Sequence, residues 1–383
     1  MRIVLLSGNG IIAPHVIDDY KQAFEALQHD VLLVKIHKGF NNTDYQNMLD
    51  FKPDIVLGYG FVGILKSSDG HFLLRESNIP VVCLHYDNPL FVLDEQFEQE
   101  FIQYPEYYYH FVWDKHCQEL LQGRGVLNVH PIMLATNEKK FYVHPYALQE
   151  EGTLAFVGSL GESQFRKEES LEQMFINYVI KEKLNNFDQP LHEICQAAEQ
   201  LTQFQAVQAV RQQQPLLFYK YIYYSIHAQG SSIYRNNILS NLSGVDLHVY
   251  GASQQTGHPS SIIYHEPVPY AHLSATYQQY AVNLNISSLQ LETSVNNRVF
   301  DVFASGAFVL SDYKTDMDIV FPGVSEEISF HDLEDLVIKA DYFLTHPEQR
   351  IELTMAIREH ILNHHTYVHR AQEIMSCLQL VAI

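Results

Sequence analysis

Residues 293–298 of this 383-residue sequence gather groups that suit the binding of a phosphate. Arg298 can form two parallel hydrogen bonds with a diphosphate through its planar guanidinium group. A helix is predicted over residues 295–304 with Ser294 as its N-cap, and the unpaired N–H groups and partial positive charge of a helix start attract anions. Hydroxyl and amide side chains add donors beside Arg298, at Thr293, Ser294, Asn296 and Asn297.

The rest of this segment predicts how the helix is buried and where it ends. Gly306 follows it, and glycine is common just beyond a helix C-terminus. Asp301 lies near the helix face of Arg298, where its carboxylate is suited to accept hydrogen bonds from ribose hydroxyls. The spacing leaves an alternative open, in which Arg298 and Asp301 form a simple surface ion pair. Four apolar residues are spaced to bury one helix face: Val295, Val299, Val302 and Phe303.

Two residues in the first half of the chain are candidates for proton transfer. His85 and Asp87 stand at the end of the apolar run over residues 80–87, on the loop side of a predicted strand. Either side chain is suited to act as a general base that accepts the proton of an attacking hydroxyl group. Alternatively, Asp87 caps the turn before Pro89, a position that favours Asp and Asn.

A glycine-rich turn near the N-terminus is a candidate acceptor or phosphate loop. Gly8, Asn9 and Gly10 follow the first apolar run, and glycine allows the backbone to approach a ligand closely. A tight turn explains the same residues without any ligand. The glycines of residues 58–63 allow the same two interpretations.

The spacing of apolar runs indicates how these residues are positioned. Strands separated by helix-length segments predict βαβ units and a parallel sheet covered on both faces. Such sheets bind ligands beyond the carboxyl ends of their strands, where all of the candidate loops are expected. The runs in the first part of the chain are residues 2–8, 31–36, 54–60, 80–87, 110–114 and 126–134.

A second unit of the same kind is expected after a boundary near residues 140–152. Residues 165–240 are predicted to be a mainly helical insertion, and helices are expected at 332–344, 348–363 and 367–380. We therefore predict a two-domain α/β protein with a doubly wound, Rossmann-like domain at 1–145, a second at 146–365, and a C-terminal helix at 366–383 that crosses back to the first. The binding site is expected in the cleft between them. Strands of the second domain are predicted at 153–161, 245–251, 261–268, 281–287 and 307–312.

Composition excludes several classes of partner. The net charge of −21, from 24 basic and 45 acidic residues, disfavours nucleic acid and anionic membranes. No apolar run is long enough for a transmembrane helix, and we interpret the N-terminus as a core strand rather than a signal peptide. The four cysteines are widely separated, as expected for reduced thiols in a cytoplasmic protein. No histidine or acidic motif with metal-ligand spacing is present, so we predict no metal and no other cofactor.

The segment from residue 294 to 312 resembles the C-terminal signature of GT-B glycosyltransferases of the spore-maturation CgeB type. That family carries an N-R-x-F-E/D-x-x-A-x-G-x-F core, although Glu is more usual than Asp at the acidic position. Residues 154–159, 85–89 and 365–370 also resemble family elements, and the resemblance covers most of the chain except the part of the insertion near residues 165–230. The core corresponds here to Asn297, Arg298, Phe300, Asp301, Ala304, Gly306 and Phe308.

The resemblance implies further donor-binding residues. Gly158 and Ser159 would follow the opening strand of the second domain and face the ligand. Gly251 would end the strand before the base pocket, and His265 would line that pocket. The Glu-x7-Glu pattern of some retaining relatives is not intact, because Thr293 stands eight positions before Asp301.

Together these observations predict a metal-independent glycosyltransferase. A nucleotide-diphosphate sugar would be the donor, and the acceptor would be a protein, a glycan, a lipid or a small molecule. Arg298 and the helix N–H groups would stabilise the negative charge that grows on the leaving diphosphate. Two alternatives stay open: a sugar-nucleotide epimerase or hydrolase on the same fold, and a non-catalytic protein that keeps the fold only to bind.

Overall fold

The computed structural model describes residues 1–10, 12–36, 40–145, 150–162, 164–242, 244–251 and 262–381. It divides into two compact units. Unit 1 comprises Met1–Met133 and Thr366–Ile383, and unit 2 comprises Leu134–His365. The first boundary therefore lies twelve residues before the predicted position at 145. Within the described ranges, no helix has both the length and the apolar character needed to span a bilayer.

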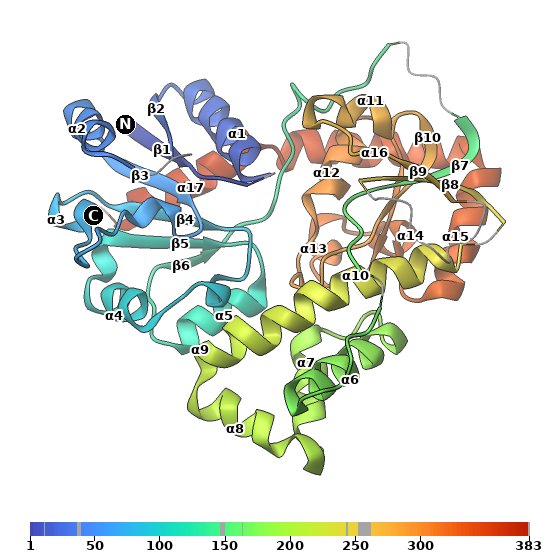
Figure 1. Ribbon diagram of the computed structural model, residues 1–383. Helices are drawn as coiled ribbons and strands as arrows, with labels where there is room; N and C mark the ends of the chain where they lie inside the picture. The colour runs from blue at the N-terminus through green and yellow to red at the C-terminus, as the bar shows by residue number, and fades with distance from the viewer. Residues whose placement is uncertain are drawn as a thin grey trace. The chain divides into compact units, whose positions relative to one another are not determined.

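Unit 1 contains a six-stranded sheet in the order β2-β1-β3-β4-β5-β6, and every neighbouring pair is parallel (Figure 1). The strands are β1 (Arg2–Ser7), β2 (Asp30–Lys35), β3 (Ile55–Tyr59), β4 (Val81–His85), β5 (Tyr108–Val112) and β6 (Val129–Pro131). The α-helices are α1 (Ala13–Ala26), α2 (Asn42–Phe51), α3 (Leu73–Glu76), α4 (Glu95–Gln103), α5 (Lys115–Gly123) and α17 (Tyr367–Val381), with 3-10 turns at Val62–Ile64, Pro89–Phe91 and Pro105–Tyr107.

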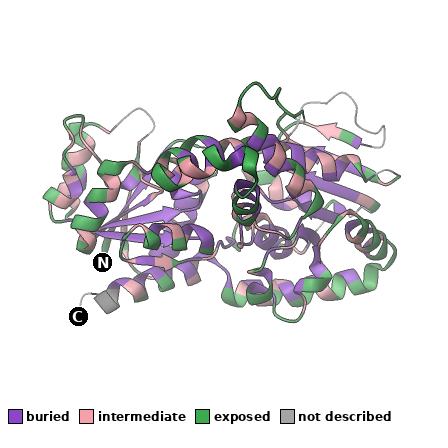
Figure 2. Cartoon of the chain, turned by 90° about the horizontal axis from the view of Figure 1, so that it is seen from below, coloured by how far each residue is buried: buried purple, intermediate pink, exposed green. Residues whose placement is uncertain are grey.

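Burial explains why these runs form strands of a parallel sheet. All five residues of β4 and of β5 are buried, whereas β2, at the edge of the sheet, is only partly covered. Continuous apolar strands require cover on both faces, which the helices supply (Figure 2). The last helix, α17, completes this cover by packing on α1, where the rings of Tyr20 and Tyr367 meet edge to face at 5.2 Å.

Unit 2 repeats this architecture around a second six-stranded parallel sheet, in the order β12-β11-β10-β7-β8-β9. The predicted two-domain α/β fold is thus confirmed. The two-residue strand β12 was not predicted, because two residues are too few to show a pattern. The strands are β7 (Glu150–Val157), β8 (Asp246–Tyr250), β9 (Ile262–His265), β10 (Tyr280–Asn285), β11 (Val309–Asp312) and β12 (Ser329–Phe330).

The predicted helical insertion is also present in unit 2. It consists of α6 (Leu171–Asn185), α7 (Leu191–Glu199), a 3-10 turn (Thr202–Phe204), α8 (Gln205–Gln213), α9 (Pro215–Leu217), a π-helix (Phe218–Tyr223) and α10 (Tyr224–Ser240). The other helices of unit 2 are a 3-10 turn (Tyr270–His272), α11 (Leu273–Tyr277), α12 (Asn297–Ala304), α13 (Met317–Val320), α14 (Ser325–Ile328), α15 (Leu333–Thr345) and α16 (Pro347–His364).

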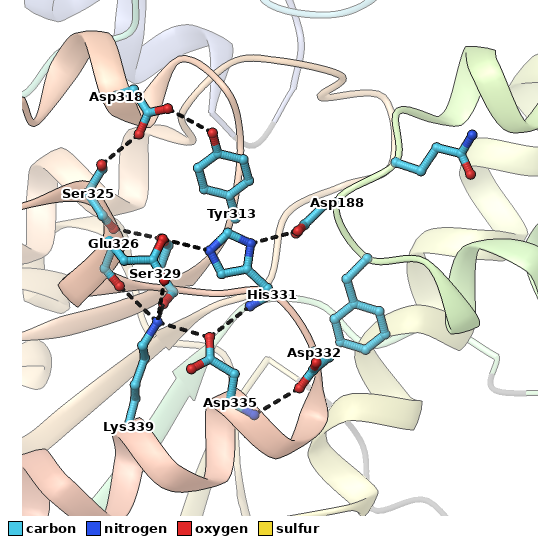
Figure 3. A network of polar contacts seen from close by, with 12 residues as sticks. Asp188, Tyr313, Asp318, Ser325, Glu326, Ser329, His331, Asp332, Asp335 and Lys339 are labelled. Atoms are coloured by element: carbon cyan, nitrogen blue, oxygen red, sulfur yellow. Dashed lines mark hydrogen bonds and ion pairs between the residues drawn. The ribbon is translucent and has the colours of Figure 1, made fainter.

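A polar network ties this insertion to the β12 edge of the sheet (Figure 3). His331 follows β12, and its Nδ1 lies 2.6 Å from Asp188 in the α6–α7 connection. Its Nε2 lies 3.0 Å from Glu326 of α14. Lys339 of α15 donates to Asp335 at 2.9 Å and to the carbonyl oxygen of Glu326 at 2.8 Å. Because both ring nitrogens face carboxylate oxygens, only the doubly protonated imidazolium of His331 can donate to both.

These contacts make the network sensitive to pH. Partial burial lowers the pKa of His331, but the hydrogen bonds to Asp188 and Glu326 outweigh it, so the net pKa is raised. A group with a raised folded-state pKa stabilises the fold fully below its unfolded pKa. That stabilisation is lost as the pH rises through the folded pKa. The charged and titratable groups around His331 are Asp188, Glu326, Asp335, Lys339, Asp318 and the phenol of Tyr313.

We expect His331→Gln to destabilise the protein at low pH and to have little effect at high pH. The expected loss of unfolding free energy is about 0.5–1 kcal/mol, the scale of a partly exposed ion pair. Urea unfolding at about pH 5.5 and about pH 8.5, on either side of an ordinary histidine pKa, measures it. The exposed His272→Gln serves as the control. Equal losses for His331→Gln at both pH values would contradict the ionic origin of the contact.

Candidate functional site

The predicted phosphate-binding helix is present as α12, but it begins two residues later than expected. Asn296, not Ser294, is the N-cap, and its side-chain oxygen accepts a hydrogen bond from the amide of Arg298 at 3.0 Å. Ser294 and Val295 are buried in the irregular segment before the helix. The prediction that Ser294 is the N-cap was wrong. Asn296 is an equally good cap, and tertiary contacts of the preceding loop decide where the helix starts.

The far end of α12 follows the prediction closely. The amide of Gly306 donates to Phe303 at 2.9 Å, and the amide of Ala307 donates to Val302 at 3.2 Å. This pair of bonds is the Schellman arrangement, which requires a left-handed residue after the cap. Gly306 supplies it with a φ of 74°, and a Cβ at this position would lie 2.7 Å from Val143. The helix is therefore fixed at its C-terminus by backbone geometry.

Arg298 is held over the carboxyl ends of β7 and β10. Its Nη1 donates to Asn285 Oδ1 at 2.6 Å, and its guanidinium carbon lies 5.6 Å from the ring centroid of Phe156. A Cβ on Gly158 would lie 3.1 Å from Arg298 Nη2 and 3.0 Å from Phe156. Gly158 therefore provides the space that the guanidinium occupies, as the absence of a side chain allows.

A second guanidinium, which the sequence analysis missed, lies beside the first. Arg235 of α10 donates to the carbonyl oxygens of Ile286 and Ser159, each at 3.1 Å. Burial and then the nearby charge of Arg298 lower the pKa of Arg235 to about 10, while Asp312 acts in the opposite direction. Among the residues that the structure describes, no carboxylate forms a salt bridge with Arg235 or Arg298. One sequence signal could have identified Arg235. Counting Lys, Arg, Asp and Glu, it is the single charged residue in the sequence of α10.

Three of the predicted donor-site residues, Gly158, Ser159 and Gly251, lie near these two arginines. Gly158 and Ser159 directly follow β7, and the amide of Gly158 donates to Tyr250 at 2.9 Å. Gly251 follows β8 with a φ of 95°, and a Cβ there would lie 3.1 Å from the carbonyl oxygen of Gly158. His265 ends β9, where its Nε2 lies 2.9 Å from His248 Nδ1 and its ring stacks on Tyr250 at 4.3 Å. Residues 252–261 lie outside the described residues.

The remaining polar residues of the segment have partners within unit 2. Thr293 donates to Asp316 at 3.2 Å and accepts from its amide at 2.9 Å. Asp301 is 3% exposed and accepts from Thr136 at 2.8 Å and from Asn297 at 3.2 Å. These bonds give Asp301 a structural role, since a buried carboxylate requires donors. Contact of Asp301 with a ribose stays a prediction.

We expect Asp301→Ala to lower the free energy of unfolding of the protein by about 1–3 kcal/mol, the cost of leaving the hydroxyl of Thr136 and the amide of Asn297 without their acceptor. The same change at the exposed Asp341 of α15 should alter it by less than about 0.5 kcal/mol. Urea unfolding of both variants measures the difference. A stability unchanged by Asp301→Ala would refute the structural role.

The two candidate bases of unit 1 differ in their surroundings. His85 is the last residue of β4 rather than part of the loop, because it pairs with Val112 in the sheet. It is 1% exposed and its Nε2 lies 3.0 Å from His110 Nδ1. Burial, and then the charge of His110, lower the pKa of His85 well below its ordinary value. The site of His85 therefore favours a neutral core imidazole over a base that meets a substrate.

Asp87, in contrast, is exposed just beyond the carboxyl end of β4. Its Oδ2 accepts a hydrogen bond from the hydroxyl of Tyr59 at 2.9 Å. The N-cap of the following 3-10 turn is Asn88, whose side chain accepts from the amide of Leu90 at 3.0 Å. A role of Asp87 as a general base stays a prediction.

Local packing or backbone conformation accounts for three glycines of unit 1, Gly8, Gly10 and Gly58. A Cβ on Gly8 would lie 3.2 Å from Val62, and one on Gly58 would lie 2.6 Å from the amide nitrogen of Gly63. Gly10 has a φ of 144°, which side chains disfavour. The exposed Asn9 stands between Gly8 and Gly10 after β1. A contact of this turn with a ligand stays a prediction.

Two groups of described residues, each within one unit, bring three potential metal-ligand atoms within 4.8 Å of one another. Cys83, His85 and His110 are buried in unit 1, and the second group is Glu326, His331 and Asp335. Lys339 already donates to two members of the second group. The hydrogen bonds of Arg235 and Arg298 described above go to other residues: Ile286, Ser159 and Asn285.

Comparison with known proteins gives the same architecture. Residues 235–376 match a family described as glycosyl transferase-like, and no curated protein matches the chain. Sucrose-phosphate synthase from Thermosynechococcus elongatus is 11% identical, with a TM-score of 0.57 over 100% of this chain and 99% of that one. A DNA-modifying β-glucosyltransferase is 10% identical, with a TM-score of 0.56 over 100% of both chains. A glycosyltransferase from Rickettsia africae is 9% identical, with a TM-score of 0.57 over 100% and 98%.

The matched segment begins at Arg235 and contains the whole of α12, so it includes both arginines of the carboxyl edge. The two parallel six-stranded sheets have the arrangement of GT-B glycosyltransferases. The chain thus has the GT-B fold, and residues 235–376 carry its glycosyltransferase-like domain.

Proposed function

We propose that this protein transfers a sugar from a nucleotide-diphosphate sugar to an acceptor without the help of a metal ion. The observation that carries the proposal is the pair of guanidinium groups, Arg235 and Arg298, at the carboxyl edge of the second sheet. Burial and mutual repulsion make two neighbouring cations a costly arrangement where, as among the described residues, no carboxylate forms a salt bridge with either of them. A bound diphosphate would offset that cost.

The proposed chemistry follows from these charges. Cleavage of the glycosidic bond increases the negative charge on the leaving diphosphate. Arg298 and Arg235 would stabilise this charge through fixed hydrogen-bond donors, which need no reorganisation during the reaction. The first amides of α12 would add the partial positive charge of a helix start.

The comparisons support this substrate class. The DNA-modifying β-glucosyltransferase has been solved in the presence and absence of its substrate, uridine diphosphoglucose. The motif from Asn297 to Phe308 further suggests the CgeB-like subtype. The acceptor is proposed to be a hydroxyl compound, because the candidate base Asp87 is suited to accept a hydroxyl proton.

We expect at least one nucleoside diphosphate to raise the melting temperature of the protein, because a ligand that binds only the folded state stabilises it by mass action. UDP, GDP, dTDP, CMP and their sugars form the panel. Because a T4 phage enzyme of similar fold was solved with UDP and Mn²⁺, each ligand is tested with EDTA and with Mn²⁺. A shift that disappears in EDTA would refute metal independence, and no shift at millimolar ligand would refute the donor site.

We expect Arg298→Ala and Arg235→Ala each to weaken binding of the active nucleotide by about tenfold or more, since each removes a charge-assisted hydrogen bond. Isothermal titration calorimetry measures the effect. Lys167→Ala is the control, because it removes a cation from the same unit at an exposed site. Equal affinity of the two arginine variants and the control would show that the anion binds elsewhere.

We expect Asp87→Asn to lower kcat by about 10²–10⁴-fold and to leave nucleotide affinity unchanged, as loss of a general base does. Release of nucleotide from the donor sugar, with water or an acceptor present, gives the rate. Tyr59→Phe, which removes only the hydrogen bond to Asp87, should have a much smaller effect. Mass spectrometry of the products separates transfer from epimerisation. An unchanged kcat would exclude Asp87 as the base.

A further inference from the structure

The helical insertion makes close contact with the loop that leads into α12. We call residues 286–296, from the end of β10 to the N-cap of α12, the donor loop. Ser231 of α10 accepts a hydrogen bond from the amide of Leu289 at 2.9 Å. Nδ1 of His227, one turn earlier, lies 3.2 Å from the hydroxyl of Ser288. With the bond from Arg235 to Ile286, three consecutive turns of α10 therefore contact the first part of the loop.

The middle of the donor loop is fixed by a buried carboxylate. The side chain of Glu292 is 1% exposed, and it accepts hydrogen bonds from the hydroxyl of Tyr223 and from the amide of His192 at 3.1 Å. Tyr223 ends the π-helix, and His192 belongs to the first turn of α7, so both donors come from the insertion. A buried carboxylate is stable only where such donors are supplied.

The insertion elements that hold Glu292 are themselves anchored. The α6–α7 connection, which leads directly to His192, is attached through Asp188 to His331 (Figure 3). Within the π-helix, Tyr223 is 1% exposed while Tyr221 is 60% exposed. Residues two apart lie on opposite sides of a helix, so one tyrosine reaches Glu292 and the other faces solvent.

We propose that the helical insertion is a positioning element for the donor site, and that Glu292 and Tyr223 are its positioning residues. The hydrogen bond between them fixes the donor loop, which sets the start of α12 and therefore the position of Arg298 relative to Arg235. Glu292 acts from within the protein core and does not contact the donor sugar. The inference rests on the proposed function for its ligand, a diphosphate, but the coupling itself is a property of the ligand-free protein.

The test compares Tyr223→Phe with Tyr221→Phe in the full chain. Both variants lose one hydroxyl from the same π-helix, but only the first loses a bond to Glu292. Hydrogen–deuterium exchange of the ligand-free proteins reports on the amides of residues 287–298, and calorimetry with inorganic pyrophosphate reports on the anion site. Ser231→Ala, which removes the acceptor of the Leu289 amide, is the second variant.

We expect Tyr223→Phe and Ser231→Ala to speed exchange in the donor loop and to raise the Kd for pyrophosphate about tenfold, the scale of one lost hydrogen bond to a charged group. Tyr221→Phe should match the wild type in both measurements. Unchanged exchange, or faster exchange with unchanged pyrophosphate affinity, would overturn the inference. If the wild type does not bind pyrophosphate, the proposed diphosphate site fails, and the exchange comparison alone decides whether the insertion positions the loop.

Discussion

The candidate site of unit 2 depends on keeping two guanidinium groups close together at one edge of a sheet. Their mutual repulsion is opposed by oxygen atoms of the protein: Arg298 donates to Asn285, and Arg235 donates to the carbonyls of Ser159 and Ile286. These acceptors follow or end the two adjacent strands β7 and β10. The parallel sheet is therefore what brings the acceptors to one place, since parallel strands end at the same edge.

Other residues of unit 2 support this arrangement by restricting the conformation of the segments around the two arginines. Gly158 leaves space for the guanidinium of Arg298, and the left-handed Gly306 fixes the end of α12. Asp301 connects α12 to Thr136, and Glu292 connects the donor loop to the helical insertion. The insertion thus belongs to the structure of the site, although it lies between two strands of the sheet in sequence.

Much of the fold could be predicted because its signals are local. Runs such as residues 80–87 are apolar and end in polar or glycine residues, so they predict buried parallel strands. The helix after β10 was expected from its apolar spacing and from Gly306. The start of α12 was not predictable, because Ser294 and Asn296 are both good caps and only the packing of the donor loop selects Asn296. Arg235 was missed for a related reason: it lies 63 residues before Arg298, and sequence spacing cannot bring them together.

The sequence by itself determined the two α/β units, the helical insertion and one cation beside a helix start, since these follow from periodicity and residue type. It also identified Asp87 and His85 as equal candidates. Only the tertiary structure separated them, by enclosing His85 beside His110 and leaving Asp87 exposed. The tertiary structure also places Arg235 beside Arg298 and brings Glu292 into hydrogen-bonding contact with the insertion. These outcomes depend on contacts between segments that are distant along the chain, and such contacts are decided by packing and burial rather than by local pattern.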